Sequence, residues 1–261
     1  MPVEILIRAE NLRLSYGDRT ALAPSNFDIP AASVTAIIGP NGAGKSTLLN
    51  AIAGLVQPTA GSLIMPQLGP GGVAYVLQST KLNELTPITV REAVGMGRYA
   101  RLGYFHRFHQ RDRSVCEQAM ERLRIGDLAN RHLSELSGGQ RQRVFVAQGL
   151  AQEASLLLLD EPITGLDLVS RQLILDVIEA ETADGTTVIG TTHSLDEAHM
   201  ADHVILLASR VVASGTPDSV LTAEYLSIAY GHPMLSAGEV LHDDPHHRPA
   251  EPRHVHFERK P

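Results

Sequence analysis

One eight-residue segment, residues 39–46, limits what this chain can fold into more than any other feature. Its sequence, GPNGAGKS, fits the pattern G-x-x-x-x-G-K-[ST] at every fixed position. It follows a short apolar run (residues 34–38) and precedes a helical pattern that begins at Thr47. Backbone N–H groups in such a turn point at one small volume, with the positive end of a helix dipole behind them. The segment therefore predicts a phosphate-binding loop. A glycine loop that matches by chance is the alternative, and the flanking strand and helix argue against it.

The residue types in this loop predict contacts with a nucleotide. The Lys45 ammonium is expected to reach the β- and γ-phosphates, and the Ser46 hydroxyl is expected to ligate Mg²⁺. The expected nucleotide-contacting residues of the loop are Gly39, Pro40, Asn41, Gly42, Ala43, Gly44, Lys45, Ser46 and Thr47.

Apolar runs along the rest of the chain predict an α/β core. Runs at residues 34–38, 73–77, 156–159, 187–192 and 204–207 have the composition of strands that are buried on both faces of a parallel sheet. Residues 3–16 alternate apolar and polar twice, which predicts a pair of half-buried antiparallel strands. Residues 84–152 show four-residue spacings such as Val115, Ala119 and Leu123, so we expect a helical insertion there.

Composition sets the class of protein and the domain boundaries. The formal net charge of -7 argues against a nucleic-acid-binding protein, which needs a basic face. The single cysteine excludes a disulfide framework, and we find neither a signal region nor an apolar run of membrane-spanning length, so we expect a cytoplasmic chain. Residues 1–230 are expected to form one domain. Residues 231–261 contain six of the twelve histidines and five prolines, which predicts a mostly disordered, His-rich tail.

Two acidic residues follow the apolar run at 156–159. A buried strand would deliver the Asp160 carboxylate beside the phosphate loop, where it can hold Mg²⁺ directly or through water. Glu161 would then orient and polarise an attacking water. A strand end that happens to carry two acids is the alternative. Beside Lys45, the pair predicts hydrolysis of a nucleoside triphosphate.

The pentapeptide LSGGQ at residues 136–140 separates the classes of phosphate-loop protein. Here the chain resembles the ATP-binding-cassette (ABC) ATPases, and the resemblance covers residues 4 to about 230. It implies a P-loop NTPase core with a parallel sheet, an N-terminal antiparallel β subdomain and an inserted α-helical subdomain that carries the signature. It also implies that ATP and Mg²⁺ are the cofactors. In the family the signature binds the ATP held by a second subunit, which implies this role for Ser137, Gly138, Gly139 and Gln140.

The resemblance also implies roles for single residues. Tyr16 matches the aromatic residue that stacks on adenine, although a half-buried strand tyrosine is the alternative. Gln78 matches the glutamine that contacts Mg²⁺ and water. Asp167 matches the loop that crosses the dimer interface, and His193 matches the histidine that contacts the γ-phosphate. Thr164-Gly165, Ser194 and Gln148-Gly149 depart from the common family pattern, but none of them replaces a phosphate-handling group.

The resemblance implies partners, because one cassette cannot move cargo across a membrane alone. It implies a homodimer with two sandwiched ATP molecules, docked on the inner face of the cell membrane under two transmembrane permease subunits. An extracytoplasmic substrate-binding protein is implied indirectly. We expect the permease to dock on residues 81–111, and a solvated helical face without a partner is the alternative. A soluble cassette that acts on DNA or ribosomes, or a nucleotide kinase, fits the charge and the signature less well.

The stretch MGRYARLGYFHR at residues 96–107 resembles the manganese and zinc importer branch of the family. The iron-siderophore and haem branch shares the Gly-Arg pair and is the alternative, followed by other cargo or export. The tail adds a further hypothesis, that its histidines bind metal and damp transport. A polar tail without this role is the alternative. The tail histidines in question are His242, His246, His247, His254 and His256.

Overall fold

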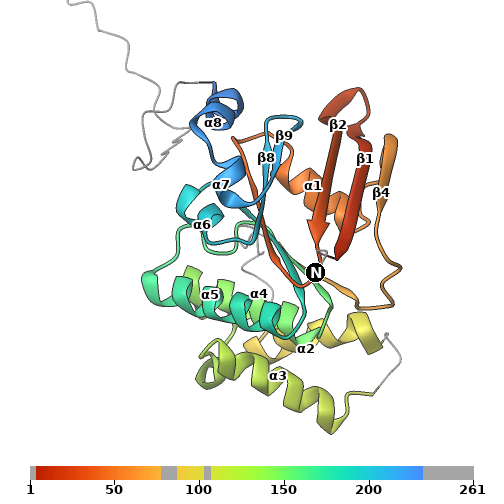
Figure 1. Cartoon of the computed structure of the whole chain (residues 1–261). Coiled ribbons are helices and arrows are strands. Elements are labelled where there is room, and N and C mark those ends of the chain that lie inside the picture. The colour runs from red at the N-terminus through yellow and green to blue at the C-terminus, as the bar shows by residue number, and fades with distance from the viewer. Residues whose placement is uncertain (1–3, 78–86, 103–106, 232–261) are drawn as a thin grey trace, which may run out of the picture.

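The computed structural model describes residues 4–77, 87–102 and 107–231, which form two sheets with helices between and around them (Figure 1). The larger sheet has the strand order β5-β6-β7-β3-β8-β9, in which β5 to β8 are parallel and β9 is antiparallel to β8. This confirms the α/β core and all the predicted core strands, with ends that differ by at most one residue. The strands are β3 (Val34–Ile38), β5 (Val73–Val76), β6 (Leu156–Leu159), β7 (Thr187–Thr192), β8 (His203–Leu207) and β9 (Val211–Gly215).

The smaller sheet is antiparallel, with the order β2-β1-β4, and it corrects one prediction. The part of the predicted segment 3–16 that the structure describes, from residue 4 onward, does not form two strands. It contributes a single long strand, β1 (Ile5–Tyr16), which pairs with β2 (Arg19–Pro30) and β4 (Ala60–Ile64). A register shift between Ala9 and Leu12, with Asn11 at a φ of 49°, marks a bulge. The extra residue shifts the phase of the alternation, so one bulged strand has the pattern of two.

Helix α1 (Lys45–Ile52) lies between the two sheets, as Figure 1 shows. Its Leu48, Leu49 and Ile52 are buried in one cluster with side chains of the antiparallel sheet and with Ile37 and Ile205 of the parallel sheet. The opposite face of the parallel sheet is covered by α5 (Leu168–Ala183) and by α6 (Leu195–His199), α7 (Pro217–Val220) and α8 (Ala223–Tyr230). The nucleotide loop thus begins at a strand that is buried on both faces.

The predicted helical insertion is confirmed. Helices α2 (Val90–Leu102) and α3 (Gln110–Arg122) lie below the sheet in Figure 1, and α4 (Gly138–Ala151) contacts both of them as well as α5. They share a core with α5 and with β5 and β6, in which Ala119, Val144 and Ala147 are buried. Short 3-10 turns at Gly126–Leu128 and Leu133–Glu135 join α3 to α4.

Some predicted features lie outside the described residues. These are Gln78, parts of the expected docking segment (residues 81–86 and 103–106) and the His-rich tail from residue 232 onward. Among the helices of the described ranges, none combines the length and apolar character that crossing a membrane requires.

Candidate nucleotide site

The glycine-rich loop places Lys45 at the first turn of α1. Gly44 is the N-cap residue, and its φ of 102° lies in the left-handed region that favours glycine. The Lys45 ammonium turns back over the loop and donates hydrogen bonds to the carbonyl oxygens of Gly39 (2.7 Å) and Pro40 (3.2 Å). Burial lowers the pKa of Lys45, while the Glu161 and Asp160 carboxylates act against this shift. The loop therefore holds a desolvated cation at the place where phosphates are expected.

A cavity of about 490 Å³ opens in front of this loop. It brings together residues that the sequence analysis assigned separately, because Tyr16, the loop and Glu161 all line it. The Tyr16 side chain is half exposed and is therefore accessible for stacking on a flat ring. Gly39 and Pro40, which were predicted to contact the nucleotide, are not among the residues that line the cavity. The lining residues are Tyr16, Arg19, Thr20, Ala21, Asn41, Gly42, Ala43, Gly44, Lys45, Ser46, Thr47 and Glu161.

Asp160 lies beside the loop, as predicted. Asp160 directly follows Leu159, the last residue of β6, and its N–H donates a hydrogen bond to the Val76 carbonyl oxygen of β5. The Ser46 hydroxyl donates a hydrogen bond to Asp160 Oδ1 at 3.3 Å. Two of the three side chains that the sequence analysis assigned to Mg²⁺, Ser46 and Asp160, are therefore neighbours, and the third, Gln78, lies outside the described residues.

Thr191 of β7 is a site residue that the sequence analysis missed. It is buried, and its hydroxyl donates to Asp160 Oδ1 at 2.6 Å and accepts the Glu161 backbone N–H at 2.9 Å. The signal in the sequence was weak: a Thr191-Thr192 pair at the end of a strand, TVIGTT, that also begins with a threonine. Threonine is common in strands, so its presence there did not point to a site.

Glu161 itself has an unusual backbone. Its φ is 49°, in the left-handed region that costs a non-glycine residue about 1–3 kcal/mol. Such backbone strain is found preferentially at functional sites, where the surrounding contacts hold it. The observation supports a role for Glu161 beyond the end of a strand.

The signature segment lies elsewhere in the chain. Ser137 is the N-cap of α4, where its hydroxyl accepts the Gln140 N–H at 3.2 Å and the Gln140 side chain accepts the Ser137 N–H at 3.0 Å. A Cβ atom added to Gly139 would lie only 2.6 Å from Asp167 Oδ2, so the signature packs against the predicted interface loop. None of residues 137–140 lines the cavity at the phosphate loop of this chain.

Asp167 and His193 both lie at the start of a helix. Asp167 is the N-cap of α5 and accepts hydrogen bonds from the Ser170 N–H (2.9 Å) and hydroxyl (2.8 Å), and these bonds lower its pKa. His193 follows β7 directly and is exposed. The next residue, Ser194, is the N-cap of α6, so this departure from the common family pattern is a good capping residue.

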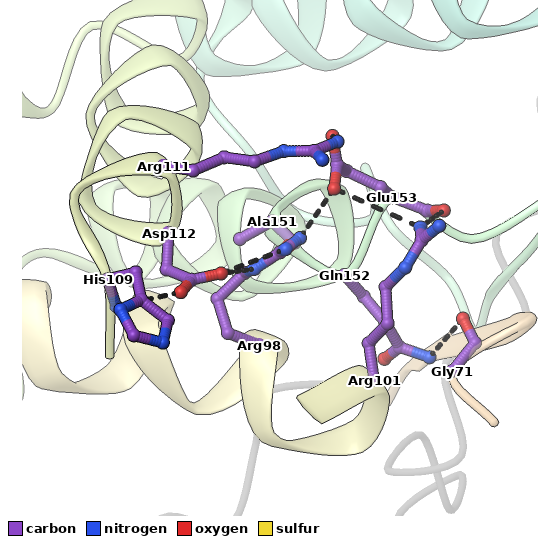
Figure 2. A network of polar contacts seen from close by, with 9 residues as sticks. All are labelled: Gly71, Arg98, Arg101, His109, Arg111, Asp112, Ala151, Gln152 and Glu153. Carbon is purple, nitrogen blue, oxygen red and sulfur yellow. Dashed lines mark hydrogen bonds and ion pairs between the residues drawn. The ribbon is translucent and has the colours of Figure 1, made fainter. Parts of the chain in front are cut away.

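The Gly-Arg pair at residues 97–98 does not lie on the surface. Figure 2 shows the Arg98 guanidinium between α2, α3 and the end of α4, where it donates to Asp112 Oδ1, the Ala151 carbonyl oxygen and Glu153 Oε2. Only 4% of the Arg98 side chain is exposed. Arg98 is therefore a packing residue of the helical subdomain, and it cannot contact a docked partner as the expected surface at 81–111 would suggest.

Gln152, at the end of α4, connects the helical subdomain to the sheet. Its side-chain amide donates to the carbonyl oxygens of Gly71 (3.1 Å) and Val73 (2.5 Å), at the start of β5. The bond to Gly71 is drawn in Figure 2. Because β5 ends two residues before Gln78, the helices are tied to the strand that leads to the predicted glutamine.

The fold and the geometry of the site define the class of protein to which this chain belongs. A phosphate-binding loop after one central parallel strand, and an Asp-Glu pair after another, are the arrangement of a P-loop ATPase. The helical insertion with its Ser137-capped signature helix narrows the class further. The family model for ABC transporters matches residues 22–164, and the chain belongs to this family as an ATP-hydrolysing subunit.

The chain is similar over most of its length to several ATP-binding subunits of metal transport systems. TroB of Treponema pallidum, named as a zinc transport system ATP-binding protein, is 39% identical, and the match covers 86% of both chains. MntB of Listeria monocytogenes, named for manganese transport, is 34% identical over 85% of this chain and 95% of MntB. YfeB of Yersinia pestis, named for chelated iron transport, is 34% identical over 90% of this chain and 83% of YfeB.

Solved structures agree with this fold. An ABC transporter provisionally assigned to the metal-chelate type, in an inward-facing conformation, superposes with a TM-score of 0.78 at 31% identity, over 88% of this chain and 90% of that one. A dimeric ATP-binding cassette with bound ADP and Pi superposes with a TM-score of 0.70 at 26% identity, over 81% of this chain and 99% of that one.

Proposed function

We propose that this chain is the ATPase of an importer for manganese or zinc ions, acting on the inner face of the cell membrane. Two copies of the chain would dock under two transmembrane permease subunits, and an extracytoplasmic substrate-binding protein would deliver the ion. The observation that supports the cargo most directly is the similarity to TroB and MntB over 85–86% of this chain.

The donor set supports Mg²⁺ as the second cofactor beside ATP. Mg²⁺ prefers oxygen ligands and is held in nucleotide sites by one or two protein oxygens together with phosphates and waters. The Ser46 hydroxyl and the Asp160 carboxylate, 3.3 Å apart, fit this requirement. When bound, the ion would neutralise developing charge on the phosphates.

Other residues of the chain would bind the nucleotide and activate the attacking water. Lys45 and the loop N–H groups would bind and orient the phosphates, and Tyr16 would stack on adenine. Glu161 lines the same cavity, so its carboxylate would polarise the attacking water. His193 would donate a hydrogen bond to the γ-phosphate, and Gln78 would contact the Mg²⁺ environment.

The surface next to Asp167 supports a second copy as partner. Leu168 and Val169 follow Asp167 at the start of α5, and they are 82% and 61% exposed. Two adjacent apolar side chains that are both exposed form a contiguous apolar surface, which is a feature of interaction sites. Residues 137–140 do not line the chain's own cavity and would act on the ATP of the opposite subunit.

The exposed part of α2 supports a permease contact. Met96 and Tyr99 lie on the outer side of this helix and are 45% and 44% exposed, while Gly97 and Arg98 between them are buried. We therefore place the contact within residues 81–111 on Met96 and Tyr99, two side chains with large apolar surfaces of the kind enriched at interfaces.

Iron in chelated form is a second candidate cargo. The name of YfeB, a protein of a chelated iron transport system, and the assignment of the superposed transporter to the metal-chelate type favour it. The Gly97-Arg98 pair is common to the manganese and zinc branch and to the iron-siderophore and haem branch. Because this pair is buried and has a packing role, it does not distinguish between the two cargoes.

The test is the metal content of cells. Manganese, zinc and iron are measured under metal scarcity in cells whose own gene carries Glu161→Gln. Glu224→Gln is the matched control, because it makes the same chemical change at an exposed residue of the last described helix. A selective fall in manganese or zinc with Glu161→Gln supports the proposal and names the ion. A fall in iron alone supports the second candidate. Unchanged metals would contradict both cargoes and leave the ATPase itself untouched.

A further inference from the structure

One hydroxyl group connects the two acidic residues of the site. Thr191 Oγ1 lies 2.6 Å from Asp160 Oδ1 and 2.9 Å from the backbone nitrogen of Glu161. We propose that Thr191 is a positioning residue for ATP hydrolysis, which sets the Asp160 carboxylate toward Mg²⁺ and holds the backbone turn that aims Glu161. The inference rests on the roles proposed above for Asp160 and Glu161, and Thr191 itself does not line the nucleotide cavity.

The chemistry of a hydroxyl fixes the direction of both bonds. Thr191 has one proton to donate, and the carboxylate is an acceptor only, so the proton points to Asp160. The backbone N–H of Glu161 is a donor only, so it uses a lone pair of the same oxygen. Hydrogen bonds to an ionised group are stronger than neutral ones, which holds Asp160 Oδ1 at a defined place beside Ser46.

The second bond acts on the strained residue. Glu161 has a φ of 49°, and the Thr191 bond satisfies its N–H in this conformation. Without the hydroxyl, the N–H would lose this acceptor and Asp160 would lose its short bond. Both acidic side chains would then gain freedom at once. Groups that orient a metal ligand typically contribute about 10- to 100-fold to metal affinity or activity.

Thr35 shows that a buried threonine hydroxyl in this sheet need not be bonded. It lies on the neighbouring strand β3, two residues before Ile37, which pairs with Thr191. Side chains two residues apart lie on the same face of a strand, so Thr35 and Thr191 face the same side of the sheet. Thr35 is fully buried, and its hydroxyl has no hydrogen-bond partner within the described part of the chain. It offers a matched control.

The experiment compares three variants of the full chain: Thr191→Val, which keeps the shape and removes the hydroxyl, Thr191→Ser, which keeps the hydroxyl, and Thr35→Val. ATP binding is measured with Mg²⁺ and again with the metal chelated, and the steady-state kcat and KM are measured as functions of Mg²⁺ concentration. Urea unfolding of each variant shows that it is folded.

We expect Thr191→Val to lower kcat about 10- to 100-fold and to raise the Mg²⁺ concentration for half-maximal binding of ATP by a similar factor. Its affinity for ATP without Mg²⁺ should stay within about twofold of wild type, because Thr191 touches no phosphate-binding group other than through Asp160. Thr191→Ser should recover most of both losses, and Thr35→Val should behave as wild type.

Equal losses with and without Mg²⁺, or no recovery in Thr191→Ser, would overturn the inference in favour of a structural role. Wild-type behaviour of Thr191→Val would overturn it as well. A Glu161→Gln variant measured in parallel distinguishes failure of the proposed function from failure of the inference about Thr191. If that variant hydrolysed ATP like wild type, the assignment of Glu161 would fail, whereas the Mg²⁺ dependence of ATP binding would still report on Thr191 and Asp160.

Discussion

Gly97 of α2 lies directly against the backbone carbonyl of Gln148 in α4. A Cβ atom added at Gly97 would overlap this carbonyl oxygen. The two helices therefore approach as closely as they do because residue 97 has no side chain. The neighbouring Gly95 differs, since its added Cβ would meet only the Phe108 ring at 3.6 Å, an ordinary contact.

This difference predicts opposite effects of the same substitution. Gly97→Ala should destabilise the chain by about 1–3 kcal/mol, because the helix axes must move apart to relieve the overlap. Gly95→Ala should leave stability unchanged or raise it by up to about 1 kcal/mol, because alanine is the better helix former. Urea unfolding of both variants checks this, and similar free energies of unfolding for the two would contradict the packing argument.

Arg98 predicts a second, larger effect. Its guanidinium faces Asp112 at 3.0 Å, and the two side chains are only 4% and 5% exposed. Burial alone would raise the pKa of Asp112, but hydrogen bonds from the His109 N–H and from Arg98 lower it overall. Arg98→Met should therefore leave a buried carboxylate without its cation and cost about 3 kcal/mol of unfolding free energy.

Arg111 is the matched control for Arg98. It also lies near Glu153, at 3.9 Å, but its side chain is 79% exposed. Surface ion pairs contribute about 0–1 kcal/mol, so Arg111→Met should hardly change stability. The free energies of unfolding of the two variants are compared at neutral pH. If Arg98→Met were as stable as Arg111→Met, the buried network would not hold the helical subdomain together.

The sequence predicted those features that depend on local patterns. Strands buried on both faces show as short, mostly apolar runs, and the phosphate loop shows as fixed residue types at fixed spacing. The long strand β1 was misread as two because the bulge at Asn11 shifts the phase of burial from Ile7 and Ala9 to Leu12 and Leu14. Phase shifts of this kind have the same pattern as a turn.

Features that depend on contacts distant in sequence could not be predicted. Thr191 and Asp160 are 31 residues apart, and only the register of β6 against β7 brings the hydroxyl to the carboxylate. The Gly97-Arg98 pair matched a family motif and was interpreted as part of a docking surface. Burial of Arg98 against Asp112 and Glu153 depends on how three helices pack, which no spacing within α2 reveals.

His203 predicts an effect of acid on stability. It is partly buried at the start of β8, and its Nε2 lies 2.9 Å from the Ser214 hydroxyl of β9. Burial lowers its pKa below the ordinary value of 6.5, although the backbone and the charge of Asp28 act in the opposite direction. In the folded state the imidazole is therefore neutral at a pH where the unfolded chain is protonated.

The sign of the effect follows from proton binding. Between the folded and the unfolded pKa of His203, the unfolded state binds more protons, so the free energy of unfolding rises with pH. Stability should be lost as the pH falls through 6.5 toward the lower folded-state value. Urea midpoints at about pH 7.5 and about pH 5.5 measure this loss, which should be smaller in His203→Gln because its side chain does not titrate. Equal losses in both proteins would assign the acid sensitivity to other groups.

Glu161 predicts a separation of binding from chemistry. Glu161→Gln removes the charge that would polarise water and keeps the shape of the side chain and its place in the cavity beside Lys45. We expect ATP to bind at least as tightly, because a negative charge next to the γ-phosphate is lost. Hydrolysis should fall by about 100-fold or more, which is the usual contribution of a general base. The ATP-bound dimer should accumulate, since it can form but hydrolyses its ATP only slowly.

Gel filtration with ATP and Mg²⁺ measures dimer formation, and phosphate release measures hydrolysis. The control variant Glu224→Gln should stay monomeric and active under the same conditions. Phosphate release by Glu161→Gln at the rate of Glu224→Gln would show that another residue activates the water.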